Sequence, residues 1–536
     1  MQPIVSLLVY CCFLFSVGFI LFGRHQKITT IKLSILGLFC IVFAVYLYKL
    51  AVFPNTFIDE ENGFYDAYSL AQYGMDSHLI KFPVYLQSLY GQGQSVLLAY
   101  MAIPFFKILG VSLFSFRLTL VVIALVGISF TCYILNKYYS KYLAPVMLAI
   151  CTAPYLITEM RFAMDCNISL WIGLLAIDFL LLGINTKNSF LPLILFYLIC
   201  GLMAYSYNVA WIYLIPLVIS ITFVLYNEKI LSFKLIILNL LLLLVEIIPI
   251  LTFAVRSNIP SLNKTIGFGI FTIPALPTSR AGASFIDIHG NILENIINNI
   301  FSGFKMLFLS SDGLSWNSIQ NFNAYYAFAI IIFIIGLYKV VVNSNKLEFK
   351  ILLILLLSNV PIWLLVQANY NHWMFTHIPV LLVIGVGVKR LQKILPYKYI
   401  YVLYLTSLLL FANAYFTTSR FTGFNVNSIK NIQYLQKVYG KKNIYFYGED
   451  KPPLVEIRNF SLISPYEFQR TKDNPYSKKE LFFEDNIANY HRVDDLSDLK
   501  KGDLLLTTKK QPKQSFKMVK ANIILGDSSY CLYRRK

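Results

Sequence analysis

The chain has 536 residues, of which 57% are hydrophobic and only 14% charged, and its mean hydropathy is +0.62. An ordinary soluble domain is about 25% charged, so this composition excludes a disordered chain and a typical cytosolic protein. Apolar runs of about 20 residues recur along the sequence, and each is long enough to cross a hydrocarbon core of about 30 Å. The sequence therefore predicts an α-helical membrane protein with many spans.

The net charge of +19, from 46 Lys/Arg and 27 Asp/Glu, does not indicate a nucleic-acid partner. The C-terminal segment 417–536 holds 22 Lys/Arg and 13 Asp/Glu, and most of the other basic residues lie in short loops between apolar runs. Basic short loops are a topology signal of membrane proteins. The eight cysteines show no CxxC spacing, which is typical of neither a disulfide framework nor a zinc site.

Twelve apolar segments are predicted to span the membrane. They lie at residues 4–23, 33–53, 117–136, 142–160, 168–184, 190–206, 209–227, 235–255, 325–343, 351–367, 376–390 and 399–416. Alternate connections between them are basic, and the positive-inside rule places those connections on the cytoplasmic side. The remaining connections and the C-terminal tail are then extracytoplasmic, in a multi-pass protein of the plasma membrane.

The predicted organisation has four parts. Residues 1–53 form two spans, 54–116 form the first outer loop, 117–416 hold the remaining spans and a second large outer loop (256–324), and 417–536 form a soluble outer domain. Residues 94–115 are apolar but contain Pro104 and Lys107, and counting them as a span would invert every later loop against its charge. We expect an interfacial helix there instead.

The tail differs in pattern from the rest of the chain. Residues 427–440 (NSIKNIQYLQKVYG) have helical periodicity, while 443–450, 503–510 and 520–535 alternate between apolar and polar residues as strands do. The tail is therefore predicted to be a small α/β domain.

Acidic residues mark where chemistry could occur, because a carboxylate near lipid is costly. Outside the tail, only Asp178 and Glu246 lie deep inside predicted spans, and most other acids fall in outward-facing segments. Ion-coupled transporters place ionisable groups near the bilayer midplane. The distribution here favours chemistry at one membrane face over transport.

The densest acidic cluster is FIDEENGFYDAYSLAQYGMD, residues 57–76. Asp59, Asn62, Asp66 and Ser69 have helical spacing and would share one face. Adjacent acids raise each other's pKa, which suits a general base or a cation site. A solvated loop that ends the second span is the alternative interpretation.

A second cluster, EMRFAMDCN at residues 159–167, lies between two predicted spans. Its polar groups are expected at the membrane face, because the connection is too short for a domain. Arg161 and Asp165 have i, i+4 spacing and could form a simple helix salt bridge. The functional alternative places Asp165 opposite Asp59 across a shared cavity.

Several segments in order resemble bacterial membrane glycosyltransferases of the GT-C class. These segments are DEENGFYDAYSLAQYGMD (59–76), FPVYLQSLYG (82–91), AYMAIPFFKILGVSLFSFRL (99–118) and APYLITEMRFAMDCN (153–167). The chain is similar in particular to the family of protein O-mannosyltransferases and lipid A aminoarabinose transferase. The resemblance covers residues 57–170 in order and spacing, and the whole transmembrane part in topology.

The resemblance implies a sugar donor carried on a polyprenyl phosphate and a cell-envelope acceptor, with inverting transfer on the outer membrane face. The first acid of the motif, Asp59, would be the general base with Glu60 beside it, and Asp165 would complete an acidic cavity. Other residues are expected to bind substrate, and these are Tyr65, Asp66, Asp76, Arg161, Asn167, Asp312 and His372. Asp312 lies in the second outer loop, where capping of the next span is the alternative.

A lipid-phosphate leaving group needs cations that stabilise its developing charge. Arg161 is one candidate, and His372 stands where relatives often carry Arg or Lys, although an interfacial anchor beside Trp373 is the alternative for this histidine. Carboxylates and histidines suit Zn²⁺ or Mn²⁺, and the candidates here are Glu60, Asp165, His78 and His372. The sequence shows no tight ligand spacing, so a divalent cation stays open and no other cofactor is indicated.

The sequence thus favours a glycosyltransferase that works in the lipid bilayer. Two other interpretations stay open. A flippase or exporter of lipid-linked glycans would need charged groups along a path through the spans, and a non-catalytic scaffold of an envelope-glycan system would tolerate loss of Asp59.

Overall fold

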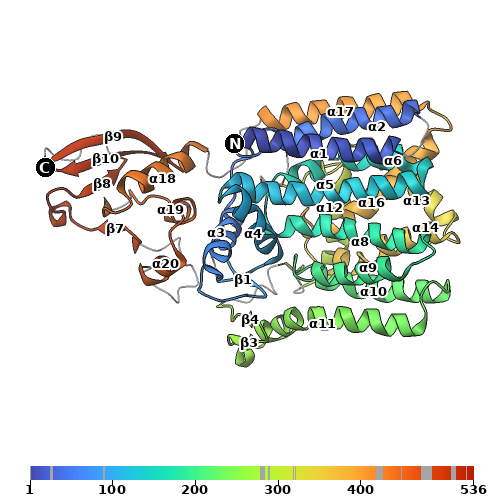
Figure 1. Ribbon diagram of the computed structural model, residues 1–536, viewed down its shortest axis with the longest axis horizontal. Helices are drawn as coiled ribbons and strands as arrows, with labels where there is room; N and C mark the ends of the chain where they lie inside the picture. The colour runs from blue at the N-terminus through green and yellow to red at the C-terminus, as the bar shows by residue number, and fades with distance from the viewer. Residues whose placement is uncertain are drawn as a thin grey trace. The chain divides into compact units, whose positions relative to one another are not determined.

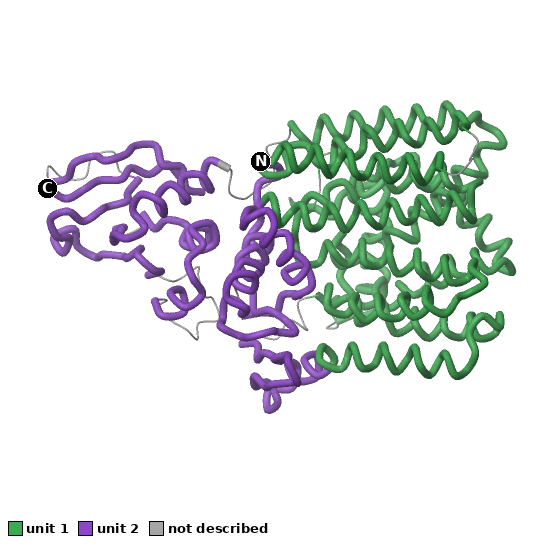
Figure 2. Tube along the Cα trace, viewed as in Figure 1, with its two compact units in different colours: residues 1–51, 114–251, 281–420 green, residues 52–113, 252–280, 421–536 purple. Residues whose placement is uncertain are grey.

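The computed structural model describes residues 2–23, 28–88, 91–277, 284–287, 290–314, 316–317, 319, 321–417, 426–447, 450–471, 486–508, 515–526 and 528–536. The chain forms two compact units (Figure 2). Unit 1 comprises residues 1–51, 114–251 and 281–420, and unit 2 comprises 52–113, 252–280 and 421–536.

Unit 1 is a bundle of helices, and each of the twelve predicted spans corresponds to a helix or a helix pair (Figure 1). These are α1 (Gln2–Phe22), α2 (Thr30–Leu47), α5 (Leu113–Tyr138), α6 (Ser140–Thr152) with α7 (Pro154–Met160), η1 (Asp165–Asn167) with α8 (Ile168–Asn185), α9 (Phe190–Met203), α10 (Ala210–Asn227), α11 (Phe233–Asn258), α13 (Ala329–Val342), α14 (Leu347–Leu357) with α15 (Val360–Leu365), α16 (Met374–Leu391) and α17 (Tyr397–Thr417).

Most of the predicted spans correspond to helices that are long and apolar enough to cross a bilayer. Within the described residues, nine helices are long and apolar enough, and the pair α6–α7, bent by 61°, makes ten. The helices α9 and α13 have only 14 residues each. A straight span needs about 20 residues, so these two predicted spans correspond to helices shorter than that length.

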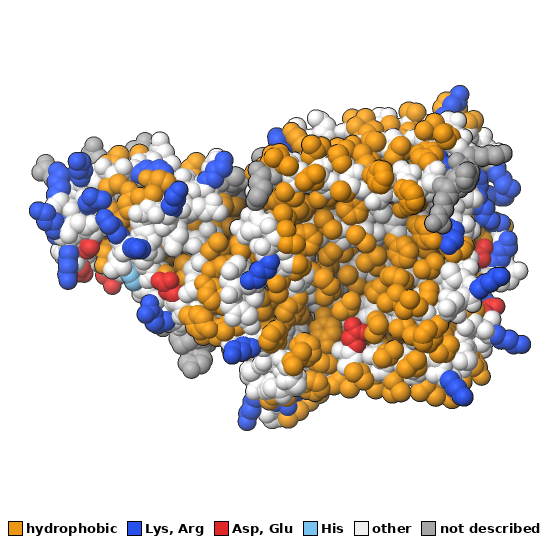
Figure 3. Space-filling view, viewed as in Figure 1, with side chains coloured by type: hydrophobic (Ala, Val, Ile, Leu, Met, Phe, Trp, Pro, Cys, Tyr) orange, Lys and Arg blue, Asp and Glu red, His pale blue; other side chains and the backbone are white. Residues whose placement is uncertain are grey.

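The surface of the bundle is typical of a protein immersed in lipid. Figure 3 shows hydrophobic side chains over the viewed face of unit 1, with Lys and Arg gathered at one end of the helices. Phe15 on α1 and Val245 on α11 are 78% and 68% exposed. A helix that is apolar on all sides needs either a core or a bilayer around it.

Glycines let two helices of the bundle approach closely. A Cβ atom added at Gly336 on α13 would lie 2.1 Å from the carbonyl oxygen of Val383 on α16. A Cβ added at Gly387 would lie 2.0 Å from the carbonyl oxygen of Ile332. Small residues at such crossings allow backbones to pack against each other, which is a main source of helix association in membranes.

Unit 2 contains two helices from the first predicted outer loop. Helix α3 (Ile58–Tyr73) begins with three acids in its first turn, where the helix dipole favours negative charge, and ends at Gly74 with φ of +70°. Helix α4 (Leu97–Leu109) has 13 residues and contains Pro104, so it is too short for a span, as predicted. The rings of Phe64 and Phe106 join the two helices, with centroids 5.7 Å apart.

Unit 2 also contains two small hairpins and five further helical segments within its described residues. The hairpins are β1 (Leu86–Gln87) with β2 (Gly93–Gln94), and β3 (Ile266–Phe268) with β4 (Phe271–Ile273). The helical pieces are η2 (Pro260–Leu262), α18 (Val426–Tyr439), α19 (Leu454–Ser461), α20 (Pro465–Thr471) and η3 (Leu496–Asp498). Helix α19 packs against α3, with the Phe64 and Phe460 rings stacked at 5.7 Å.

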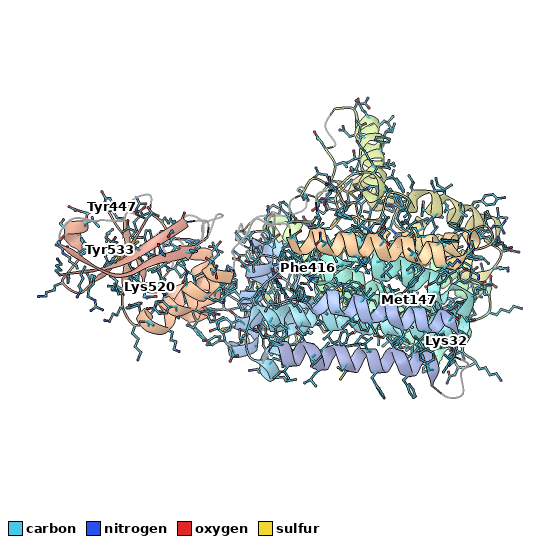
Figure 4. All side chains as sticks on the ribbon, turned by 90° about the horizontal axis from the view of Figure 1, so that it is seen from above. Lys32, Met147, Phe416, Tyr447, Lys520 and Tyr533 are labelled. Atoms are coloured by element: carbon cyan, nitrogen blue, oxygen red, sulfur yellow. The ribbon has the colours of Figure 1, made fainter. Side chains whose placement is uncertain are left out.

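The tail also forms a six-stranded mixed sheet in the order β6-β7-β5-β8-β10-β9. Its strands are β5 (Ile444–Tyr447), β6 (Asn486–Ile487), β7 (Tyr490–Val493), β8 (Leu504–Thr507), β9 (Phe516–Leu525) and β10 (Ser528–Arg535). Strand β5 is parallel to β7 and β8, and the other pairs are antiparallel. Lys520 on β9 lies 3.2 Å from the ring centroid of Tyr434 on α18 (Figure 4). The predicted α/β character of the tail is confirmed.

Helix α12 (Ile292–Phe308) of unit 1 differs from the spans. It lies in the second predicted outer loop, and in Figure 4 it points away from the bundle, across the direction of the long helices. The side chain of Asn291 caps its first turn by accepting from the backbone N–H of Glu294 at 3.3 Å. Its Gly303 packs directly against Trp373, since a Cβ there would lie 2.0 Å from the indole ring.

Candidate active site

The first turn of α3 presents three consecutive acids with different exposure. Asp59 is partly exposed, whereas Glu60 and Glu61 are buried at 0% and 1%. Thr56, just before the helix, donates its hydroxyl hydrogen to Glu61 at 2.5 Å. Asp59 is therefore the carboxylate of this turn that has access to its surroundings.

Behind Asp59, polar side chains form a buried network on α3. The Asn62 amide donates to Gln94 Oε1 at 2.7 Å and to Asp66 Oδ2 at 3.3 Å. The Gln94 amide in turn donates to the backbone carbonyl of Asp59 at 2.9 Å. Gln94, at the end of β2, thus ties the hairpin to the turn that carries Asp59.

The cation of this network, Arg458, comes from α19 in the tail. It is 1% exposed and donates to Asn62 Oδ1 at 3.1 Å, although the two residues are 396 positions apart. Its guanidinium group lies 4.1 Å from the ring centroid of Tyr65 and 4.9 Å from that of Phe468. Stacking on two rings and charge-assisted hydrogen bonds offset the cost of burying a cation.

Burial raises the pKa of several acids around Arg458. It raises the pKa of Glu61 to about 8, against the Thr56 hydrogen bond, and that of Glu456 to about 9, with Glu61 adding repulsion. The pKa of Asp76 rises to about 7, and that of Asp66 is also raised, although the Ser77 hydrogen bond opposes it. Burial thus favours the protonated forms of Glu61 and Glu456 at neutral pH.

The predicted substrate-binding residues of α3 and the loop after it hold the local fold together. The Tyr65 hydroxyl donates to the carbonyl of Ile463 at 2.8 Å. Asp66 Oδ1 accepts from the N–H of Ser77 at 2.9 Å, and Asp76 Oδ1 accepts from the N–H groups of His78 and Ile80. All three predicted residues are fully buried, so we interpret them as positioning residues for α3.

In unit 1, Arg161 is fully buried and holds the end of α2. Its guanidinium donates to the carbonyls of Val45, Tyr46 and Tyr48 at 2.6–2.7 Å and lies 4.9 Å from the ring centroid of Phe416. These carbonyls belong to the last turn of α2, which lacks intrahelical partners for them. The guanidinium is therefore directed at backbone oxygens of α2.

Asp165 lies 8% exposed at the start of the short helix η1. Helix α7 ends at Met160, and residues 161–164 are not helical, so Arg161 and Asp165 do not share a helix. The helical i, i+4 geometry considered for this pair from the sequence is therefore not formed.

A second buried network in unit 1 joins residues of three segments. The Asn317 amide donates to Asp312 Oδ2 at 2.8 Å and to Asn371 Oδ1 at 2.5 Å. The Asn371 amide lies 3.3 Å from Asn167 Oδ1 and 3.4 Å from Glu159 Oε2. The structure thus brings together the predicted residues Asn167 and Asp312 through two asparagines that the sequence reasoning did not weigh as a pair.

His372 is partly exposed in the turn before α16. Its Nδ1 lies 2.9 Å from the side-chain amide of Asn369 and 2.9 Å from the carbonyl of Gln367. Of the predicted site residues, unit 1 thus holds Arg161, Asp165, Asn167, Asp312 and His372, and unit 2 holds Asp59, Glu60, Tyr65, Asp66 and Asp76. That Asp165 faces Asp59 stays a prediction.

A bound divalent cation needs three or more ligand side chains close together. No three His, Cys, Asp or Glu side chains of the described segments gather as metal ligands would. Glu60 and His78, both in unit 2, therefore do not fit a metal centre of the usual kind with their described neighbours.

The fold is similar to solved structures of membrane enzymes. ArnT from Cupriavidus metallidurans bound to undecaprenyl phosphate has a TM-score of 0.59 and 12% identity over 93% of this chain and 97% of that chain. The same protein in the apo state has a TM-score of 0.54 and 10% identity over 94% and 98%. The Archaeoglobus fulgidus oligosaccharyltransferase in complex with Zn and sulfate has a TM-score of 0.50 and 11% identity over 82% and 62%.

Neither a protein-family profile nor a curated protein matches the sequence. The class is nevertheless defined by structure, because the chain is a multi-pass membrane protein with the fold of the GT-C glycosyltransferases. Within that class, the likeness to ArnT extends over nearly the full length of both chains. The resemblance expected from the sequence is thereby confirmed at the level of the fold.

Proposed function

We propose that the chain is a glycosyltransferase that moves a sugar from a polyprenyl-phosphate donor to a hydroxyl group of a cell-envelope acceptor. The likeness to ArnT supports a lipid-linked donor, because that protein has been solved bound to undecaprenyl phosphate. The likeness covers 93% of this chain and 97% of ArnT. Since a fold can host several functions, the proposal depends on the residues of the site.

The observation that carries the proposal is the exposure of Asp59. Its neighbours Glu60 and Glu61 are buried, and burial raises the pKa of Glu61 to about 8. A general base must be within hydrogen-bond reach of the proton it takes, and in this turn only Asp59 combines a carboxylate with access. Gln94 and the Asn62 network hold the turn in place.

The reaction would proceed by inverting displacement. The Asp59 carboxylate takes the proton of the acceptor hydroxyl as its oxygen attacks the anomeric carbon of the donor sugar. The bond between that carbon and the phosphate oxygen breaks, and its electron pair leaves with the polyprenyl phosphate. The proton on Asp59 then passes to solvent, which restores the base.

The charge pattern of unit 1 supports an outer site. Helices α2, α5, α11 and α17 carry Lys32, Lys137, Lys234 and Lys398 at one end, and their other ends continue into the segments of unit 2. The positive-inside rule directs the lysine-bearing ends to the cytoplasm. Asp59 and the C-terminal sheet would then be extracytoplasmic.

The proposal can be tested with purified protein in detergent. The protein is incubated with radiolabelled polyprenyl-phosphate sugars and a cell-envelope extract, and transfer of label to the extract is counted. We expect transfer from at least one donor, and none from the same sugars linked to a nucleotide. Transfer from nucleotide sugars, or from no lipid-linked donor in a broad panel, would contradict the proposal.

A further inference from the structure

Unit 1 contains a groove of about 940 Å³ beside α12. One wall is the polar side of α12, with Asn295, Asn298 and Ser302, and the other walls are the segments 285–287 and 365–368. Small-molecule sites in proteins have volumes of about 300–1,000 Å³, so the groove has room for more than one sugar unit. None of the residues used above for the transfer reaction lines it.

The walls of the groove are fixed by hydrogen bonds. The segments at 284–287 and 365–367 pair through the backbone, with the N–H of Ile286 donating to the carbonyl of Leu365 and that of Gln367 to the carbonyl of Ser284. Asn299 of α12 donates to the carbonyls of Trp363 and Val366 and accepts from the N–H of Ala368. The groove is therefore pre-formed, which lowers the cost of binding.

The lining favours a neutral ligand that is rich in hydroxyl groups. Asn298, Ser302 and Gln367 are exposed side chains that both donate and accept hydrogen bonds, as sugar hydroxyls do. Phe285, 43% exposed, offers an apolar surface to the C–H side of a sugar ring. None of the described lining residues is Lys or Arg, and Asp287 is acidic, so the groove does not suit a phosphate.

A second stripe of α12 indicates where the groove lies. Leu293, Ile297 and Phe301 are 68%, 64% and 69% exposed and form an apolar stripe next to the Asn298–Ser302 stripe. An amphipathic helix that runs across the direction of the spans belongs at the membrane interface, with its apolar face in lipid. The groove would then open at the level of the lipid headgroups.

We infer that this groove is a saccharide-binding subsite, which holds the neutral glycan of the membrane-anchored acceptor at the lipid surface. The inference rests on the proposed function for the identity of the glycan as acceptor, but saccharide binding can be measured without transfer. Helix α12 would supply the hydrogen bonds from Asn298 and Ser302, and the lipid in which its apolar face lies would supply the acceptor.

The test uses the full chain in lipid nanodiscs without a sugar donor. Binding of maltotriose, mannotriose, galactotriose and triacetylchitotriose is measured by saturation-transfer NMR and titration. The variant Ser302→Trp fills the groove, and Ile297→Trp places the same residue on the lipid-facing side as a matched control. Asn298→Ala removes a hydrogen-bonding group without adding bulk, in case Ser302→Trp fails to fold.

We expect the wild type and Ile297→Trp to bind at least one trisaccharide, and Ser302→Trp or Asn298→Ala to bind it about ten-fold or more weakly. Binding of none of the four by the wild type, or unchanged binding by both groove variants, would overturn the inference. If the wild type transfers sugar but binds no trisaccharide, only the inference fails. If it binds a trisaccharide but transfers no sugar, only the proposed function fails.

Discussion

Arg458 links the tail to the acids of α3, and it shows what a single residue contributes to the candidate site. Its guanidinium is hydrogen-bonded to Asn62 and stacked on Tyr65. Its positive charge also lowers the pKa of three nearby acids, Glu61, Asp66 and Glu456, against the larger effect of burial. A buried cation in such surroundings stabilises the ionised form of each acid. Its removal therefore affects the whole group.

The first prediction concerns replacement of this cation. Arg458→Ala should lower the free energy of unfolding by about 3–5 kcal/mol, because it leaves buried polar partners without their charge. Arg458→Lys should cost less, since it keeps the charge but loses the planar stacking. Thermal unfolding in detergent, followed by intrinsic fluorescence, measures both. The control Arg492→Ala removes a more exposed arginine of the same unit, and an equal loss there would contradict the assignment.

The second prediction follows from the raised pKa of Glu61, about 8 in the folded protein against about 4.3 when unfolded. Between these values the folded state binds more protons than the unfolded state, so the free energy of unfolding falls as pH rises from about 4 to about 8. Glu61→Gln should therefore stabilise the protein at pH 9 relative to wild type, and much less at pH 5.

Thermal midpoints of wild type and Glu61→Gln across this pH range check the second prediction. Glu467→Gln, which changes a less buried glutamate of the same unit, serves as the control. Parallel curves for wild type and Glu61→Gln would show that Glu61 is already ionised at neutral pH in the folded protein.

At the scale of elements, the crossing of α13 and α16 depends on glycine. Gly336→Ala should destabilise the bundle by about 1–3 kcal/mol, because its new Cβ would meet the backbone of α16, which cannot move aside as a side chain can. Gly18→Ala on α1 is the matched control, since nothing lies within 4 Å of a Cβ there. The measurement is the shift in thermal midpoint of each variant relative to wild type. Equal midpoints for Gly336→Ala and wild type would contradict the close crossing.

Much of the fold could be predicted from the sequence because hydropathy is a local property. The spans, the short α4 and the strands β5, β8 and β10 follow from apolar runs or alternation within about 20 residues. The short strands β6 and β7 were not predicted. The bend of 61° between α6 and α7 could not be predicted in this way, because both helices lie within one predicted span, 142–160.

The candidate site was less predictable, because its contacts join distant segments. The acidic cluster and Asp59 follow from their local pattern. Arg458, however, donates a hydrogen bond to Asn62 from the basic tail, where a positive charge is typical of a solvent-exposed surface. The bonds between Asn317 and Asn371 likewise require the folded chain. Asparagines and a lone arginine carry no distinctive spacing, so only tertiary structure reveals their partners.

At the scale of the whole molecule, the C-terminal segment is an integral part of unit 2. It supplies Arg458, Phe460 and Phe468, which contact Asn62, Phe64 and Tyr65 on α3. A chain that ends at Thr417 should therefore lose order in α3, as well as sugar transfer.

Hydrogen exchange of residues 58–73 in the truncated and full chains measures this loss. We expect faster exchange in α3 of the truncated chain, and unchanged exchange in α16, which lies in unit 1 and serves as an internal control. Equal protection of α3 in both chains would show that the tail is dispensable for its fold.

The central claim is that Asp59 is the base of a sugar transfer from a lipid-phosphate donor. The most direct measurement compares transfer by wild type, Asp59→Asn and the control Asp494→Asn, whose side chain is 91% exposed in the tail, after equal thermal midpoints have been verified. We predict that Asp59→Asn lowers the transfer rate by about 10²–10⁴-fold, while Asp494→Asn transfers as wild type does. Transfer by Asp59→Asn at the wild-type rate would contradict the account and would direct the search for the base to Asp165.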